Sequence, residues 1–440
     1  MTATPPSGTG HVQLDLADLH AGLRDPAMES MNFLNEVAGR YPDAISFAPG
    51  RPYEEFFEVE QIHDHLRRYE RYLADERKQS PDQVRRTLFQ YGRTKGIVHE
   101  VVARYLEVDE GISTDPEALV ITVGCQEAMY LVLRALRADD RDAVLAVAPT
   151  YVGLAGAARL VDMEVLPVAS GPQGVDLDDL TATLHRARRE GLRPRACYVV
   201  PDFSNPTGVS LDLPTRRALL ELAGQEDLLL LEDNPYGVFN ATAERLPTLK
   251  ALDTTGQVVY LGSFAKTGFP GARVGFAVAD QLVRTADGRT VLFADELSKL
   301  KSMVTVNTPP LSQAVIAGKL LEHGYSLEKA NQREIEVYRD NLRLMLDGLT
   351  RRFPPGSEPR VGWNTPGGGF FLVVTVPFRA DDALLEHSAR EHGVLWTPMR
   401  HFYEGESAAT QIRLSYSLLT PERIELGLDR LAALIREQHD

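Results

Sequence analysis

Residues 263–275 read Ser-Phe-Ala-Lys-Thr-Gly-Phe-Pro-Gly-Ala-Arg-Val-Gly, and this is the most informative stretch of the chain. It follows the apolar run Val-Val-Tyr-Leu-Gly at 258–262, which predicts a short strand ending in a glycine- and proline-rich turn. The turn gathers the hydroxyl of Ser263, the amine of Lys266 and the guanidinium of Arg273. A lysine amine of lowered pKa can form a Schiff base with a carbonyl, while the other two groups grip a phosphate. The alternative is a surface lysine in an ordinary turn, but the spacing of Ser263, Lys266 and Arg273 disfavours it.

The spacing Ser-x-x-Lys-x-x-x-Pro-Gly-x-Arg-x-Gly resembles the cofactor-lysine signature of class I aminotransferases, which belong to the fold type I pyridoxal-phosphate enzymes. Pyridoxal phosphate carries both an aldehyde and a phosphate. The resemblance implies that Lys266 binds this cofactor covalently and that Ser263 and Arg273 bind its phosphate. It also implies an α/β fold, with a large domain built on a mostly parallel central sheet and a smaller α+β domain.

Two upstream motifs agree with this resemblance. Four leucines at 228–231 predict a strand buried on both faces, and Asp233 and Tyr236 follow its end. A buried carboxylate needs a cationic partner, and a protonated pyridine nitrogen would suit Asp233; the alternative is a helix N-cap. Asn205-Pro-Thr-Gly follows another apolar run and is also a common turn sequence. In the family, this asparagine and the tyrosine matched by Tyr236 bond the phenolic oxygen of the cofactor.

Residues 118–136 predict a strand to 123, a turn at Gly124, Cys125 and Gln126, and a helix from 127. The free N–H groups at the start of a helix favour an anion. The segment looks like the phosphate cup of the family, with cysteine where serine or alanine is more usual. Tyr151 matches the aromatic residue that stacks on the cofactor ring, or it caps the next helix; Val147 replaces a frequent glutamate before it.

Further positions concern the substrate and a second subunit. Arg413 lies in the alternating strand pattern 412–417, and it matches the arginine that binds the α-carboxylate of the substrate. Gly50 and Arg51 match the substrate mouth, where we hypothesise that Arg51 recognises a polar or anionic side chain; a surface ion pair is the alternative. Tyr91 matches the tyrosine that reaches the phosphate of the neighbouring subunit, which implies a homodimer.

Within the family, residues 45–52 and 366–371 look like the branch of aminoadipate and kynurenine aminotransferases. Residues 31–35 together with 46–53 are similar to transaminases that make aryl-glycines for peptide antibiotics. The resemblance therefore implies amino transfer between an amino acid, of aromatic or aryl-glycine type, and a 2-oxo acid.

Other functions remain open from the sequence alone. The same residues would support a β-lyase or a decarboxylating or oxidative deaminase. A DNA-binding regulator fits less well, because residues 1–40 leave no room for a basic domain. A protein that only binds the cofactor would leave the Lys266 constellation unexplained.

Composition agrees with a globular enzyme of several domains. The chain has 440 residues and a net charge of −15, which argues against nucleic acid or an anionic membrane as a partner. Two cysteines in unlike contexts indicate no disulfide framework and no zinc site, and no His-x-x-x-His pair suggests a metal. The N-terminus lacks the pattern of a signal peptide and no apolar run is long enough for a bilayer, so we expect a cytoplasmic protein.

Strand and helix patterns alternate from 118 to 280, which predicts a parallel sheet with covering helices. A charged helical pattern at 326–352 predicts a linking helix, and Thr420-Pro421 predicts the start of the last helix. We expect a flexible arm at 1–20, a segment at 21–75 that joins the small domain and the substrate mouth, a cofactor domain at 76–325, and a linking helix with the small domain at 326–440.

Overall fold

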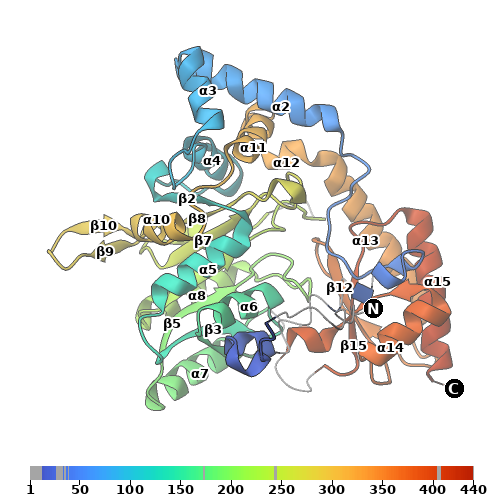
Figure 1. Ribbon diagram of the computed structural model, residues 1–440. Helices are drawn as coiled ribbons and strands as arrows, with labels where there is room; N and C mark the ends of the chain where they lie inside the picture. Colours follow the sequence, from blue (N-terminus) through green and yellow to red (C-terminus); the bar gives the residue numbers. More distant parts are fainter. Residues whose placement is uncertain are drawn as a thin grey trace.

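A computed structural model describes residues 12–25, 33, 36, 37, 39–171, 174–241, 245–403 and 408–439 (Figure 1). Residues 1–11 of the expected N-terminal arm lie outside the described residues. The motif at 31–35 lies outside them as well, except for Phe33.

The centre of the larger part is a seven-stranded sheet with the order β2-β8-β7-β6-β5-β3-β4. The five neighbouring strands β7, β6, β5, β3 and β4 run parallel to one another. Strand β8 is antiparallel to both of its neighbours, β2 and β7. This confirms the predicted, mostly parallel sheet. The strands are β2 (Leu119–Thr122), β3 (Asp142–Val147), β4 (Glu164–Val168), β5 (Arg193–Val199), β6 (Leu229–Asp233), β7 (Val258–Ser263) and β8 (Gly275–Val278).

Helices cover both faces of this sheet. Since successive side chains of a strand point to opposite faces, each strand contributes to an apolar cluster on either side. Tyr198 of β5 and Leu231 of β6 pack in one apolar cluster, whereas their neighbours Cys197 and Leu230 pack in another. The unbroken leucine run is therefore a strand buried from both sides. One face carries α5 (Gly124–Leu136), α6 (Val152–Leu160) and α10 (Phe293–Val304); the other carries α7 (Leu177–Arg189), α8 (Leu213–Gln225) and α9 (Leu249–Leu252).

Helix α5 begins three residues earlier than the sequence predicts. The helix starts at Gly124, whose own φ is +74°, so Cys125 and Gln126 are helical and do not form a separate turn. The side chain of Glu127 accepts a 2.6 Å hydrogen bond from the N–H of Val123, the residue before the helix. This reaching back of an acidic side chain stabilises the first turn.

A second, antiparallel sheet with the order β11-β12-β15-β14 forms the smaller part (Figure 1). The last helix, α15 (Pro421–Glu437), starts after Thr420, whose side chain accepts a hydrogen bond from the N–H of Arg423, as predicted. Its apolar side chains Ile424, Leu428, Leu431 and Ile435 are buried. The other elements here are β11 (Gly362–Trp363), β12 (Phe371–Thr375), β14 (Thr397–Pro398), β15 (Gln411–Ser415), α14 (Asp382–His387), and β1 (Ile45–Ser46), which pairs with β13 (Val394–Leu395).

The predicted linking helix at 326–352 is two helices, α12 (Leu327–Ala330) and α13 (Gln332–Arg352). They are separated at Asn331, whose buried side-chain amide donates to the carbonyl of Leu327 at 2.7 Å. Early residues of α13 pack in the core of the larger part, and later ones pack in the core of the smaller part. This helix therefore joins the two.

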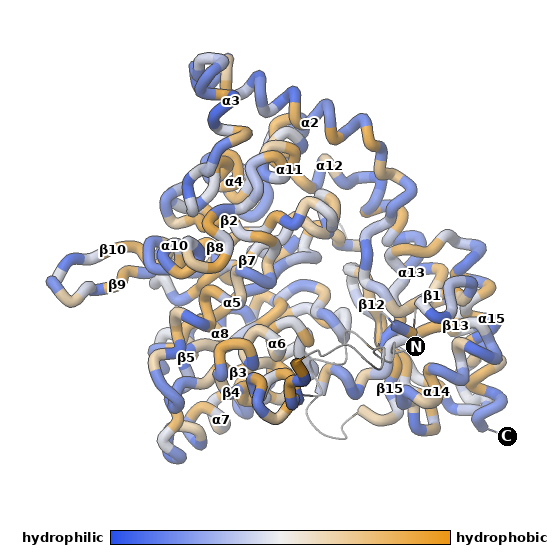
Figure 2. The backbone as a smooth tube through the Cα atoms, in the orientation of Figure 1, coloured by the Kyte–Doolittle hydropathy of each residue, from blue (hydrophilic) through white to orange (hydrophobic). Residues whose placement is uncertain are grey.

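Helix α2 (Val59–Arg71) lies along the outside against α11 (Pro310–Glu322), and it is mostly hydrophilic in Figure 2. It contains His63 and His65. Among the described residues, the structure has no helix long and apolar enough to cross a membrane. The remaining elements are α3 (Pro81–Phe89), α4 (His99–Tyr105), β9 (Leu282–Arg284), β10 (Thr290–Leu292), the 3-10 helices 16–18, 21–24, 116–118, 270–272 and 399–402, and the π-helical turns 72–76, 106–110 and 388–392.

Candidate active site

A cavity of about 510 Å³ lies where the parallel strands end and where the smaller part faces the sheet. Asp233 and Ser263 are the last residues of β6 and β7, and Asn205 follows β5. Carboxyl ends of parallel strands meet at one edge of a sheet, where such folds bind ligands. The cavity is lined by every predicted site residue except Gly124 and Tyr91: Gly50, Arg51, Cys125, Gln126, Tyr151, Asn205, Asp233, Tyr236, Ser263, Lys266, Arg273 and Arg413.

The Lys266 amine lies inside this cavity and donates a 2.7 Å hydrogen bond to the carbonyl of Gly50. Burial lowers the pKa of Lys266 to about 8, and the positive charges of Arg413 and Arg273 act in the same direction. A lysine with this pKa is substantially neutral in mildly alkaline solution, and only the neutral amine is a nucleophile.

The Asp233 carboxylate is buried and accepts two hydrogen bonds from side chains. The hydroxyl of Tyr198 donates to Oδ2 at 2.7 Å, and the thiol of Cys125 donates to Oδ1 at 3.5 Å. The turn that follows β6 is held instead by Asn234, whose side chain accepts from the N–H of Gly237, so this side chain and not Asp233 takes the capping role. Burial raises the pKa of Asp233 to about 6, and the hydrogen bond from Tyr198 opposes that rise.

Sequence reasoning missed Tyr198 as a site residue. It lies beside Leu231 in the parallel pairing of β5 with β6, so its side chain is on the same face as Asp233, two residues farther along. A tyrosine within the otherwise apolar run at 196–200 was the available signal, because a buried phenol needs a hydrogen-bond partner.

The predicted phosphate cup comes together at the start of α5. The N–H groups of the first helical turn lack partners within the helix. The guanidinium of Arg273 lies so close to Gly124 that a Cβ atom there would be 2.3 Å from its Nη2. Ser263 lines the same region of the cavity, and the amide of Gln126 donates to the carbonyl of Gly153 at 2.6 Å, fixing α5 against α6. Helical N–H groups, a hydroxyl and a guanidinium form a donor set suited to a phosphate.

Arg413 projects from β15 and is 6% exposed. Its guanidinium donates to the carbonyl of Ala48 and to the side chain of Asn205, both at 2.6 Å, and to the hydroxyl of Thr397 at 3.1 Å. All three acceptors are neutral, and the buried Nε has no hydrogen-bond partner among the residues that the structure describes. A buried cation surrounded by neutral acceptors is costly, so the site favours an anionic ligand.

The aromatic and amide groups of the cavity are arranged around this arginine. The Oδ1 atom of Asn205 accepts from Arg413, and its remaining amide group is a donor. The ring centroids of Phe371 and Phe402 lie 4.4 and 4.9 Å from the guanidinium carbon of Arg413. Burial raises the pKa of Tyr151 to about 12 and also raises that of Tyr236, so both remain neutral phenols.

Two of the predicted site residues, Arg51 and Tyr91, are exposed to solvent. Arg51 is an exposed residue whose side chain borders the cavity, while its carbonyl accepts from the hydroxyl of Ser417. Tyr91 is 83% exposed and borders a separate surface hollow, so the single chain does not bring it to Lys266.

The chain matches the family of class I and II aminotransferases over residues 70–431, and it therefore belongs to that family. It is a pyridoxal-phosphate-dependent transaminase with the fold type I architecture, as the sequence predicted.

Relatives define its position within the family more narrowly. It is 59% identical to the (S)-3,5-dihydroxyphenylglycine transaminase of Amycolatopsis orientalis over 423 residues, 96% of this chain and 95% of the relative. It is 32% identical to the 2-aminoadipate transaminase of Thermus thermophilus, covering 90% of this chain and 91% of the relative. These matches confirm the predicted branch.

Solved structures of aminotransferases superpose on this chain along most of its length. The kynurenine aminotransferase of Pyrococcus horikoshii superposes with a TM-score of 0.79 at 29% identity, covering 94% of this chain and 95% of that one. The α-aminoadipate aminotransferase of Thermus thermophilus, complexed with N-(5'-phosphopyridoxyl)-L-leucine, gives 0.75 at 30% identity, covering 94% and 97%.

The residues present fit the cofactor. The cavity holds a lysine of lowered pKa and a buried carboxylate, and an anion cup adjoins it. The unpartnered Nε of Arg413 marks a place for a further anion.

Proposed function

We propose that this transaminase transfers the amino group between an aryl-glycine or closely related aromatic amino acid and a 2-oxo acid. The proposal rests on the 59% identity to a dihydroxyphenylglycine transaminase along nearly the whole chain. The cavity supports it, because Met129, Val152, Phe402 and Leu418 add apolar wall around the polar groups. An aromatic ring without a flexible spacer suits such walls.

Each polar group then has a role toward the cofactor. Lys266 would attach it, Ser263, Arg273 and the first N–H groups of α5 would hold its phosphate, and Asp233 would hold its ring nitrogen. Tyr151 would pack on its ring, and Tyr236 and Asn205 would bond its phenolic oxygen. When bound, pyridoxal phosphate supplies an electron sink that stabilises negative charge at the α-carbon of the substrate.

Side chains of the protein itself bind the substrate and transfer its proton. Arg413 binds the α-carboxylate through its guanidinium and fixes the orientation of the α-carbon. Lys266, once its amine is free, removes the proton from that carbon as a general base and delivers it again as a general acid. The lowered pKa of Lys266 suits this exchange, because an efficient proton carrier has a pKa near the working pH.

One experiment tests the reaction type. Purified holoenzyme is mixed with phenylglycines and other aromatic amino acids without any 2-oxo acid, and products are measured by mass spectrometry. Transamination yields one equivalent of 2-oxo acid per site and then stops. Several turnovers with release of ammonia or carbon dioxide would contradict the proposal and make the chain a lyase or an oxidative deaminase. Lys266→Ala is the inactive control.

Arg51 gives the substrate proposal a finer test. We propose that its side chain, at the mouth of the cavity, reads polar substituents of the substrate. Arg51→Ala should raise KM for hydroxylated phenylglycines while leaving KM for unsubstituted phenylglycine nearly unchanged. Arg360→Ala, at a side chain that is 88% exposed, is the matched control. Equal substrate profiles for Arg51→Ala and the wild type would rule out this role.

We also propose a homodimer in which Tyr91 completes the phosphate site of the partner subunit. Tyr91 and Phe89 are 83% and 74% exposed, and Met303 is 84% exposed. Gly92, next to Tyr91, approaches Asn307, so these apolar side chains belong to neighbouring segments. A face of this kind is typical of a subunit interface.

Mixing two inactive variants tests that arrangement. Tyr91→Ala chains refolded with Lys266→Ala chains form mixed dimers with one fully native site if Tyr91 acts across the interface. Activity should then exceed the sum of the two separate variants. Simple additivity, or a monomer in sedimentation, would contradict the proposal.

A further inference from the structure

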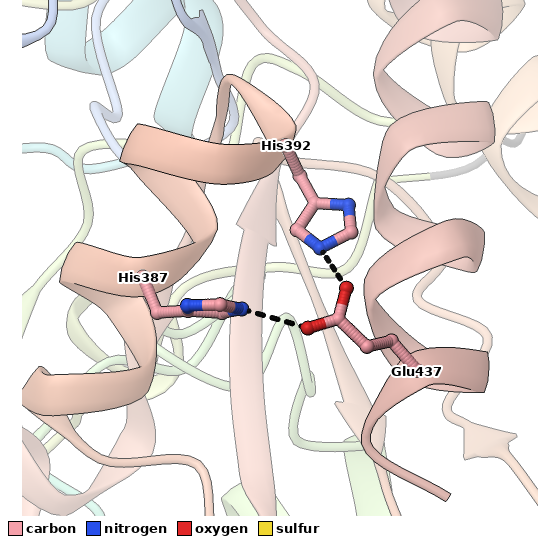
Figure 3. Close-up of side chains that lie close together, drawn as sticks. All are labelled: His387, His392 and Glu437. Carbon is pink, nitrogen blue, oxygen red and sulfur yellow. Dashed lines mark hydrogen bonds and ion pairs between the residues drawn. The ribbon is translucent and has the colours of Figure 1, made fainter. Parts of the chain in front are cut away.

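Two histidines and a glutamate converge on the smaller part (Figure 3), and none of the three lines the active-site cavity. His387 ends α14, His392 ends the π-helical turn 388–392, and Glu437 ends α15. The Nε2 atoms of His387 and His392 lie 2.9 and 2.8 Å from the two carboxylate oxygens of Glu437. One carboxylate therefore faces both imidazoles.

The π-helical turn is what brings the two histidines together. An α-helix advances about 100° per residue, so side chains five positions apart point in different directions. In a π-helical turn the backbone hydrogen bonds run between residues five apart, as from the N–H of Gly393 to the carbonyl of Ser388, so side chains five apart lie closer to one face than in an α-helix. The imidazole centroids are 5.8 Å apart. A search for His-x-x-x-His spacing misses this pair because the spacing belongs to an α-helix.

We propose that His387, His392 and Glu437 form a binding site for a divalent transition-metal ion of the zinc class. Two imidazoles and one carboxylate are a known zinc donor set, with water completing the coordination. One ligand atom from each residue lies within 4.8 Å of the others, so small side-chain movements bring all three to bonding distance. On binding, each imidazole gives up its hydrogen bond to Glu437 and takes the neutral tautomer with its proton on Nδ1, so that Nε2 offers its lone pair to the metal.

The backbone that carries these ligands is held in place without a metal. The guanidinium of Arg430, on α15, donates to the carbonyl of Gly393 at 2.8 Å, directly after His392. The same carbonyl accepts from the N–H of Ile45. A site preorganised in this way loses little entropy when it binds.

Burial and charge also suit a cation. The side chains of His392, His387 and Glu437 are 13%, 31% and 48% exposed, so solvent can reach the site and supply the remaining ligand. Glu391 lies close enough to interact electrostatically with His387 and Glu437, and it pairs with Arg390. The cysteines, which zinc also favours, are both buried elsewhere and do not compete. Among the described residues, this is the one group of three candidate ligands in such proximity.

Zinc would tie the end of α15 to the π turn, so its expected effect is on the stability of the smaller part. The test uses holoenzyme without a polyhistidine tag, dialysed against chelator and then titrated with zinc chloride by calorimetry. We expect one zinc ion per chain and a rise in Tm with zinc concentration. Co²⁺ in place of zinc should give visible absorbance from a coordinated site.

The variants are His387→Gln with His392→Gln, and Glu437→Gln alone. Each should weaken zinc binding by about tenfold or more and abolish the rise in Tm, while transaminase activity shows that the variants fold. His185→Gln is the matched control, because His185 pairs with Glu226 at 3.2 Å and the described part of the chain places no third candidate ligand beside them. Wild-type binding that the double variant retains, or no stoichiometric zinc binding at all, would overturn the proposal.

Discussion

The phenolic hydroxyl of Tyr198 donates a 2.7 Å hydrogen bond to the carboxylate of Asp233 across the adjacent parallel strands β5 and β6. Burial in this position raises the pKa of Asp233 to about 6, whereas the bond from Tyr198 stabilises the ionised form and lowers it. Tyr198 is therefore a positioning residue, since it acts on the cofactor only through Asp233.

Tyr198→Phe removes this bond and should raise the pKa of Asp233. A hydrogen bond to a charged group contributes about 1.5–3 kcal/mol, which corresponds to at least about one pH unit. Activity that requires ionised Asp233 is lost as pH falls through its pKa, so a higher pKa moves this loss to higher pH. We expect the acid limb of kcat/KM to shift upward by about one unit.

Tyr69→Phe is the control for that experiment. Tyr69 is equally buried, but its hydroxyl donates to the carbonyl of Ile97, outside the cavity. This variant should lose some stability and keep the wild-type pH profile. An unshifted acid limb in Tyr198→Phe would show that the bond does not tune Asp233.

Lys266 supplies a second prediction. In the apoenzyme, the rate of covalent pyridoxal phosphate uptake should follow the neutral fraction of the Lys266 amine. Because its pKa is lowered to about 8, the rate should rise through pH 8 and level off above pH 9. Stopped-flow absorbance measures this directly. A rate that still climbs steeply at pH 10 would indicate an amine of ordinary pKa.

The sequence predicted those parts of the site that follow from strand order. Asp233, Ser263 and Lys266 follow apolar runs, and parallel strands place their carboxyl ends at one edge of the sheet. The role of Tyr198 depends on the register between β5 and β6, which no local pattern encodes. The break between α12 and α13 depends on the buried side-chain amide of Asn331. The proximity of His387 and His392 depends on the π-helical turn 388–392. Such departures from regular helices arise from tertiary packing.

The two cysteines should be unreactive in the native protein. Burial raises the pKa of Cys125 well above its usual range and that of Cys197 to about 12, and the charge of Asp233 adds to the effect at Cys125. Only the thiolate reacts rapidly with disulfide reagents. Ellman's reagent should therefore detect no thiol before unfolding and both thiols in guanidinium chloride. Rapid reaction of one thiol in folded holoenzyme would show that the cavity exposes Cys125 as a thiolate.

Gly124→Ala should weaken cofactor binding, because the new methyl group would meet the guanidinium of Arg273 at 2.3 Å. The arginine side chain can rotate away, so the cost falls on the phosphate site and not on packing. Its φ of +74° adds strain of about 1–2 kcal/mol for any residue with a Cβ atom. Gly111→Ala is the matched control, because Gly111 has a φ of +65° but no atom of the described residues would lie within 4 Å of its Cβ. Both variants should lose similar stability in calorimetry, but only Gly124→Ala should raise the Kd for pyridoxal phosphate, by about tenfold or more, given the strength of charged phosphate contacts. Equal Kd values for the two variants would remove Arg273 from the phosphate site.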